Sequence, residues 1–417
     1  MFTSRRDFLN QVAAGATVWS SVSSRPGQLQ AAEAGDESFW ESVRRQFSFT
    51  EEKVPMNAAN LCPSPAAVAQ LVNELTADID RDCSFQNREK FDRMLELSRE
   101  KVARRLGISP DEVALVRNTT EANNIINNGV SLKPGDEIII WDQNHPTNNV
   151  AWDVRAVRFN LVVRRVSTPD HPEDTGRLIE VFTKAFNPRT RLLAITHASN
   201  TSGLRLPVRE LCEIARRFGI YVHVDGAQAW GALNVNLREL GCDSYTASSH
   251  KWLLGPKEAG LLYVRQDRVP EIWPNCVGSG WGSTKTPEVQ GARRFESLGQ
   301  RDDACLAAIA TAVDFHQSIG PSQIESRILH LAAALKAGAR ELGARLLTPA
   351  EPELSAGVCV IKISPEKRQQ VFDRFYTQFG IAGAPTGGMR LCPHIYNTAQ
   401  HIERALEALK SVRELLR

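Results

Sequence analysis

The sequence lacks long apolar runs and lacks an excess of either charge. No segment of the 417-residue chain approaches about 18 uninterrupted apolar residues, the length a membrane-spanning helix needs, so we expect no membrane partner for the mature protein. Its 50 basic and 48 acidic residues leave a formal net charge of +2, so the charge balance does not favour nucleic acid as a partner. A small-molecule partner is therefore expected.

The sequence also lacks any cysteine pattern typical of a metal site. None of the eight cysteines lies in a C-x-x-C pair or at a spacing typical of zinc ligands. We therefore expect no bound metal.

The N-terminus differs in composition from the rest of the chain. Residues Ser4–Leu9 contain an arginine pair followed by Asp, Phe and Leu, and a weakly apolar stretch leads to Ala32–Ala34, a small-residue cleavage site. This pattern predicts that residues 1–34 are a twin-arginine signal peptide, with a frayed basic terminus as the alternative. A periplasmic or otherwise exported protein is expected, with residues 35–65 as an N-terminal arm. That route carries proteins folded in a reducing cytoplasm, so we predict mostly free, buried thiols.

From about residue 66 the sequence alternates strand-like and helix-like segments. The apolar strand candidates lie at Val113–Val116, Glu137–Trp141, Leu161–Val163, Leu192–Thr196 and Tyr221–Val224. Continuous apolar strands separated by helices predict a mostly parallel sheet covered on both faces. The expected fold class is α/β, with a large domain over residues 66–294.

After about residue 295 the pattern changes to long helices with one strand. The expected elements are helices at 304–318, 324–342 and 365–379, a strand at 357–363, and a terminal helix from Ala399. This pattern predicts a smaller α+β domain over residues 295–417.

The most informative motif surrounds Lys251, which follows Ser248, Ser249 and His250. Upstream, Asp225 closes an apolar strand. A lysine among hydroxyl residues, downstream of such an aspartate, is what a pyridoxal 5'-phosphate (PLP) enzyme needs. Lys251 would hold the cofactor aldehyde as a Schiff base, and Asp225 would pair with the protonated ring nitrogen. A surface lysine and a loop-capping aspartate are the alternatives.

A second group of residues predicts a phosphate site. Thr119 and Thr120 lie between a strand and a helix that begins near Glu121, where unpaired backbone N–H groups and the helix dipole favour an anion. Ser248 and His250 can both donate hydrogen bonds to a phosphate oxygen. An ordinary threonine cap and a core histidine are the alternatives.

Three further residues are candidates for contact with the cofactor ring. Gln228 follows Asp225 by three positions, so its amide could reach the phenolic oxygen. His145 follows the strand ending at Trp141 and could stack on the ring and assist proton transfer. Asn200 follows another strand and could hydrogen-bond the phenolic oxygen, with a turn-forming asparagine as the alternative.

With these motifs the chain resembles the class V aminotransferase family of PLP enzymes, a fold-type I group that includes cysteine desulfurases, aminotransferases and isopenicillin N epimerases. The resemblance covers nearly everything after residue 50. It implies a seven-stranded type of sheet, a homodimer, and the cofactor roles given above for Lys251 and its neighbours. It also implies that Arg390 binds the α-carboxylate of a substrate, a role for which a planar bidentate donor is suited.

Two positions depart from the family pattern. Gln300 stands where family members commonly have a threonine that reaches the partner subunit's phosphate, and its amide can still donate there. The desulfurases carry a nucleophilic cysteine shortly before the carboxylate-binding arginine, whereas residues Ile381–Met389 contain none. Cys392 is interpreted as a core residue. The absence of that nucleophilic cysteine argues against a cysteine desulfurase.

The expected function is that of a PLP-dependent enzyme acting on an amino acid, similar to isopenicillin N epimerase. The preference for an isopenicillin N epimerase-like enzyme rests on the pattern of the segments Asn144–Asn149 and Gly299–Asp302. An aminotransferase or a β-eliminating sulfur lyase is the alternative, and a non-catalytic protein that binds PLP or amino acids is a third reading. The substrate side chain would be set by less patterned stretches such as Gly278–Gly282 and Asn57–Pro65.

Overall fold

A computed structural model describes residues 33–278 and 290–416. Most of the predicted signal peptide and most of the Gly278–Gly282 stretch lie outside the described residues. Residues 34–417 form one compact unit. The division of that unit into domains at 66–294 and 295–417 stays a prediction.

The centre of the fold is a seven-stranded sheet with the order β2-β8-β7-β6-β5-β3-β4. Its strands are β2 (Val113–Val116), β3 (Glu137–Trp141), β4 (Val162–Val166), β5 (Thr190–Thr196), β6 (Tyr221–Asp225), β7 (Ser244–Ser248) and β8 (Gly260–Val264). Strand β8 runs antiparallel to both of its neighbours, β2 and β7, and strands β4, β3, β5, β6 and β7 are mutually parallel. The predicted α/β class and mostly parallel sheet are confirmed.

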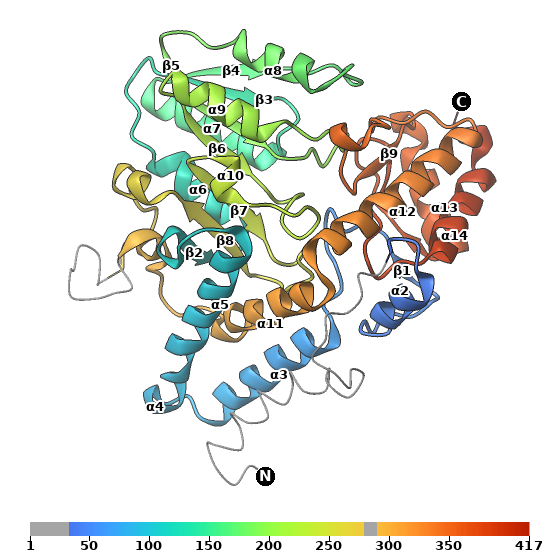
Figure 1. The fold of residues 1–417 in the computed structure, drawn as a ribbon, viewed down its shortest axis with the longest axis horizontal. Coiled ribbons are helices and arrows are strands. Elements are labelled where there is room, and N and C mark those ends of the chain that lie inside the picture. Colours follow the sequence, from blue (N-terminus) through green and yellow to red (C-terminus); the bar gives the residue numbers. More distant parts are fainter. Residues whose placement is uncertain (1–32, 279–289, 417) are drawn as a thin grey trace. The chain divides into compact units, whose positions relative to one another are not determined.

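Helices cover this sheet because its apolar strands need burial on both faces. They are α6 (Thr119–Gly129), α7 (Pro146–Phe159), α8 (Thr175–Thr183), α9 (Val208–Arg217) and the short α10 (Leu237–Leu240). Helices α6 and α7 pack against each other, and α8 packs against α9 (Figure 1). Within the described residues, no helix has both the length and the apolar character that crossing a membrane requires.

The remaining elements come from both ends of the chain. They are α2 (Glu37–Arg44), β1 (Val54–Pro55), α3 (Ala66–Arg81), α4 (Phe85–Arg88), α5 (Lys90–Leu106), α11 (Asp303–Ile319), α12 (Pro321–Glu341), β9 (Cys359–Ile361), α13 (Pro365–Phe379), β10 (Ile381–Ala382), β11 (Met389–Leu391) and α14 (Ala399–Ser411). Strand β1 pairs with β10, and β9 pairs with β11. Helix α11 packs against α3 and α5. The N-terminal arm is therefore built into the C-terminal part of the fold.

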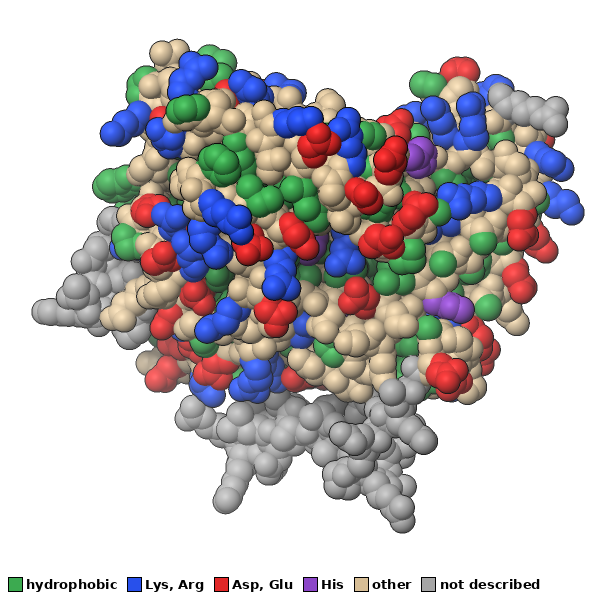
Figure 2. All heavy atoms as spheres, turned by 45° about the horizontal axis from the view of Figure 1, so that its top comes forward, with side chains coloured by type: hydrophobic (Ala, Val, Ile, Leu, Met, Phe, Trp, Pro, Cys, Tyr) green, Lys and Arg blue, Asp and Glu red, His purple; other side chains and the backbone are tan. Residues whose placement is uncertain are grey.

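The surface carries charges of both signs. On the face drawn in Figure 2, Lys and Arg side chains are interspersed with Asp and Glu side chains. Such mixing leaves no broad single-sign field on this face.

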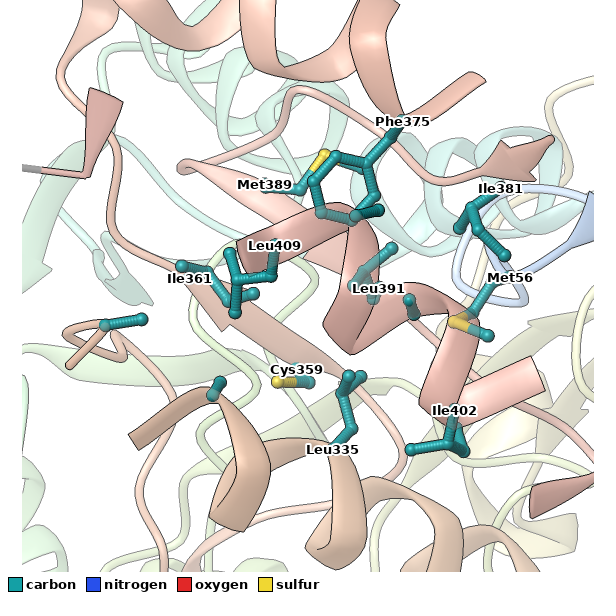
Figure 3. Close-up of a cluster of buried hydrophobic side chains, with 14 of the residues drawn as sticks. Met56, Leu335, Cys359, Ile361, Phe375, Ile381, Met389, Leu391, Ile402 and Leu409 are labelled. Atoms are coloured by element: carbon teal, nitrogen blue, oxygen red, sulfur yellow. The ribbon is translucent and has the colours of Figure 1, made fainter. Parts of the chain in front are cut away.

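A buried apolar cluster holds the C-terminal elements together (Figure 3). Phe375 on α13 lies in it with its side chain fully buried, beside Met389 and Leu391 of β11. The next residue on the helix, Tyr376, is 42% exposed. The buried face of α13 is therefore narrow, and its burial contributes to the stability of the strand that carries Arg390.

We predict that Phe375→Ala lowers the free energy of unfolding by about 3–5 kcal/mol, because it leaves a cavity in a packed cluster. The matched variant Tyr376→Ala should cost less than about 1 kcal/mol, since its ring is partly in water. Urea-induced unfolding of both variants measures the difference. Equal losses would contradict the packing described here.

Candidate active site

The predicted site residues gather where parallel strands end. Strand β6 ends at Asp225 and β7 at Ser248, and the loops after β3 and β5 carry His145 and Asn200. Because β3, β5, β6 and β7 are parallel, their carboxyl ends meet at one edge of the sheet, where ligands bind in such folds. The strand topology brings together residues that are far apart in the sequence.

Asp225 is a buried carboxylate without a cationic partner. Only 2% of the residue is exposed. Its oxygens accept hydrogen bonds from Asn123 Nδ2 (2.9 Å) and from the backbone N–H of Ala227 (3.0 Å), and it forms no ion pair within the described part of the chain. A buried charge without a partner is costly, so this carboxylate is arranged for a cationic group that a ligand supplies.

Lys251 lies beyond the end of β7, within electrostatic range of Asp225. Burial lowers the pKa of Lys251 because it disfavours the charged ammonium; Asp225 opposes the shift and Arg390 adds to it. The turn after Lys251 is tight, since the N–H of Leu254 donates to the Lys251 carbonyl and Leu254 has a positive φ of 60°. The result is a lysine held near a carboxylate and able to be neutral at lower pH than usual, as a nucleophile requires.

Arg390, on β11, is a buried cation without a carboxylate partner among the residues described. One terminal nitrogen donates to the Asn200 carbonyl (2.9 Å) and the other to Asn57 Oδ1 (3.0 Å). The Nε–H is buried and has no partner. Since a guanidinium has five N–H donors, one edge remains available for an anion such as a carboxylate.

The predicted phosphate residues lie at the N-terminus of α6. Ser248 Oγ accepts from the Thr119 N–H (2.8 Å) and lies 2.7 Å from Thr119 Oγ1, which ties β7 to α6. Thr120 is exposed in the first helical turn, where N–H groups have no intrahelical partner. Burial, followed by the charges of Lys251 and Lys257, lowers the pKa of His250 to about 4. His250 is therefore neutral near pH 7.

His145 caps α7, and its Nδ1 lies 2.8 Å from Thr147 Oγ1. Partial burial of the ring lowers the pKa of His145; Lys251 and Arg390 lower it further, and Asp225 opposes them. His145 is therefore within electrostatic range of the same charged groups. A neutral imidazole there can carry a proton.

Gln228 connects the N-terminal arm to the turn that follows Lys251. Gln228 donates through Nε2 to the Ala59 carbonyl (2.9 Å), and its Oε1 accepts from the Trp252 indole (2.8 Å). These two hydrogen bonds fix the orientation of the Gln228 amide and use one of its two N–H groups. The backbone N–H of Cys62 donates to the His250 carbonyl (2.9 Å).

Among the described residues, the hydrogen bonds of Gln300 go to none of the other predicted site residues. Its Oε1 accepts from Arg88 (2.8 Å) and its Nε2 donates to the Arg301 carbonyl (3.0 Å). It borders a cavity of about 400 Å³ that Arg117 and Glu258 also line. Its predicted reach to a partner subunit's cofactor stays a prediction.

Asn123 was missed in the sequence, and Asn57 was named only as the start of a stretch that would set the substrate side chain. Asn123 lies four residues after Thr119 on α6, so helical spacing puts the two on the same face, and this was the available signal. Asn57 reaches Arg390 from the far end of the sequence, and no local pattern indicates that contact.

The residues present fit PLP. Asp225 has no cationic partner in the part of the chain that the structure describes, and Lys251 has a lowered pKa. The helix N-terminus at Thr120 suits a phosphate. The unpaired Nε–H of Arg390 adds a place for a carboxylate beside them. The donor set thus matches a phosphorylated, cationic-ring cofactor together with an amino acid.

Comparison with known proteins gives consistent matches. The family model described as Aminotransferase class-V matches residues 65–404. Isopenicillin N epimerase from Streptomyces clavuligerus is 33% identical over 396 residues, covering 89% of this chain and 98% of that protein. Cysteine desulfurase from Salmonella dublin is 31% identical over 333 residues, covering 74% and 79%.

Solved structures match as well. A C-DES mutant with glycine covalently linked to its PLP cofactor superposes with a TM-score of 0.81 at 24% identity, covering 88% of this chain and 98% of that one. The apo cysteine desulfurase from Thermococcus onnurineus NA1 gives 0.80 at 23% identity, covering 90% and 98%. At these identities the likeness shows the fold.

We predict that Asp225→Asn moves the pH profile of Lys251 methylation to lower pH in cofactor-free protein. The reason is that the Asp225 charge raises the pKa of Lys251 against the effect of burial. Mass spectrometry of methylation rates at several pH values measures the shift, with the exposed Lys257 as the internal control. An unchanged Lys251 profile would refute the electrostatic link.

Proposed function

Given that this chain belongs to the aminotransferase class-V family, a family of PLP-dependent enzymes, we propose that it converts an amino acid in the manner of isopenicillin N epimerase. The support is the 33% identity to that epimerase over 89% of this chain, against 74% coverage for the cysteine desulfurase. An antibiotic precursor as substrate is not implied.

One observation carries the proposal: buried charges of both signs lie together without partners. Asp225 has no cation and Arg390 has no anion within the described residues, and Lys251 is electrostatically linked to both. PLP with an amino acid supplies the missing charges, a cationic ring nitrogen for Asp225 and a carboxylate for Arg390.

The chain's own groups then divide the work. When bound, PLP supplies an aldehyde that joins to an amine and a ring that withdraws electrons from the α-carbon. Arg390 orients the carboxylate, and Lys251 Nζ takes the α-proton because its lowered pKa increases the share of neutral amine that can act as a base. Epimerisation needs the proton returned to the opposite face, and neutral His145 is our candidate for that second carrier.

The cysteines argue against a desulfurase. Cys62 and Cys392 are both buried. Burial raises the pKa of Cys62 to about 12 and also raises that of Cys392. A buried, protonated thiol is a poor nucleophile. An aminotransferase or a β-eliminating lyase is the second candidate, because both begin with the same proton removal.

We predict that the purified protein shows a visible absorption band from lysine-bound PLP and exchanges the α-proton of a substrate for deuterium. Lys251→Ala should remove the band and reduce turnover by at least about 10⁴-fold, whereas Lys257→Ala should preserve both. Absorbance, and NMR in deuterated water with a panel of L-amino acids, measure these effects. A D-isomer supports epimerisation, and a keto acid or an eliminated fragment supports the second candidate.

The same experiment tests the proposal as a whole. Turnover that survives Lys251→Ala would overturn the mechanism. A wild-type protein without a band after PLP addition would favour a non-catalytic amino-acid-binding protein.

Export and dimerisation are proposed from the sequence. The twin arginines Arg5 and Arg6 support export, and the family resemblance supports a homodimer, in which the Gln300 amide would take the place of the usual threonine at the partner subunit's site. We predict that Arg5→Lys with Arg6→Lys retains the protein in the cytoplasm, because the export signal needs the arginine pair. Cell fractionation with intact-mass measurement checks this, and unchanged periplasmic yield would contradict it. Sedimentation velocity reports the oligomeric state.

A further inference from the structure

A buried chain of hydrogen bonds lies behind Asp225. Asn123 Nδ2 donates to Asp225 Oδ2 (2.9 Å). Asn123 Oδ1 in turn lies 2.7 Å from Thr246 Oγ1 and 3.0 Å from His223 Nε2. His223 Nδ1 lies 2.8 Å from Ser244 Oγ. None of these residues is more than 2% exposed, so water does not compete for their hydrogen bonds.

The chain has only one consistent arrangement of protons. An ionised Asp225 can only accept, so the Asn123 amide must present its NH₂ to Asp225 and its oxygen to Thr246 and His223. His223 Nε2 must then carry a hydrogen. Burial lowers the pKa of His223 to about 3, so the ring is neutral and its Nδ1 accepts from Ser244. Reversing the Asn123 amide would turn its oxygen toward the Asp225 carboxylate and oppose two acceptors.

This arrangement restrains the carboxylate while adding no positive charge. Asp225 Oδ2 is held by Asn123 and Oδ1 by the Ala227 N–H. Asn123, Thr246, Ser244 and neutral His223 contribute dipoles alone. A carboxylate oriented in this way keeps its full charge for the group in front of it.

From this geometry we infer that Asn123, held by Thr246 and His223, is a positioning residue that orients Asp225 so that the ring nitrogen of bound PLP keeps its proton. The inference rests on the proposed function. It assigns a role to a helix residue and a strand hydroxyl that do not touch the cofactor. The competing explanation is that the chain only stabilises the packing of α6 on the sheet.

The test uses the holoenzyme loaded with PLP labelled with nitrogen-15 in the ring. NMR of that nitrogen reports whether it is protonated, independently of turnover. Asn123→Ala should move the signal toward that of the unprotonated ring. Asp225→Asn should move it in the same direction and complete the shift. We also expect kcat to fall about 10- to 100-fold with KM changed less, a loss typical when outer hydrogen bonds that orient a ligand are removed.

Two controls separate positioning from packing. Asn127 lies one helical turn further along α6 and is 1% exposed, so Asn127→Ala also disturbs a buried asparagine of this helix. It should leave the ring-nitrogen signal unchanged. Thr246→Val removes one donor to Asn123 at nearly constant volume and should shift the signal partway. Thr246→Ser keeps the hydroxyl and should give the wild-type signal. The two Thr246 variants still test the inference if Asn123→Ala does not fold.

The outcomes distinguish this inference from the function on which it rests. A wild-type protein that gives no bound-PLP nitrogen signal overturns the proposed function. A protonated wild type whose signal moves in Asp225→Asn but not in Asn123→Ala or Thr246→Val overturns the positioning role alone. An equal shift in Asn127→Ala would show a packing effect and would also overturn it.

Discussion

The burial of one unpaired carboxylate is the constraint on which the site depends. Asp225 closes a central strand and is almost inaccessible to solvent, yet no described lysine or arginine pairs with it. Removing a charge from water without a partner costs several kcal/mol unless hydrogen bonds compensate. Asn123 and the Ala227 N–H supply part of that compensation, and a cationic ligand supplies the rest. The fold therefore keeps an unfavourable buried charge, and that charge serves to bind a cationic ligand.

Close backbone packing places Lys251 in front of this carboxylate. Gly231 has a φ of +94°, and a Cβ there would lie 2.4 Å from the Trp252 backbone. Glycine is thus required for the segment after Asp225 to lie against the turn that follows Lys251. His394 supports the same turn from the other side, since its Nε2 lies 2.9 Å from the Trp252 carbonyl. The position of Lys251 is set by the packing of this turn as much as by the preceding strand β7.

The N-terminal arm is hydrogen-bonded to site residues from several parts of the chain. Asn57 contacts Arg390, and Ala59 contacts Gln228. Through Cys62 the arm also holds the residue before Lys251. The carboxylate-binding arginine and the lysine turn are therefore tied to one short segment, and a displacement of that segment would disturb both.

Local sequence determined the α/β class and the apolar strands and predicted the roles of Lys251 and Asp225, because period, apolar runs and residue chemistry act over a few neighbouring positions. The role of Arg390 was predicted from the resemblance to the family. It did not reveal β7 and β8, which were absent from the predicted strands. In β7 the reason is physical: Ser244, Thr246 and Ser248 are polar, yet each is buried with a hydrogen-bond partner on another element. Only the tertiary structure decided that Asn123 supports Asp225 and that Gln300 contacts Arg88 within this chain. These contacts join residues about a hundred or more positions apart, and long-range hydrogen bonds leave no mark in local pattern.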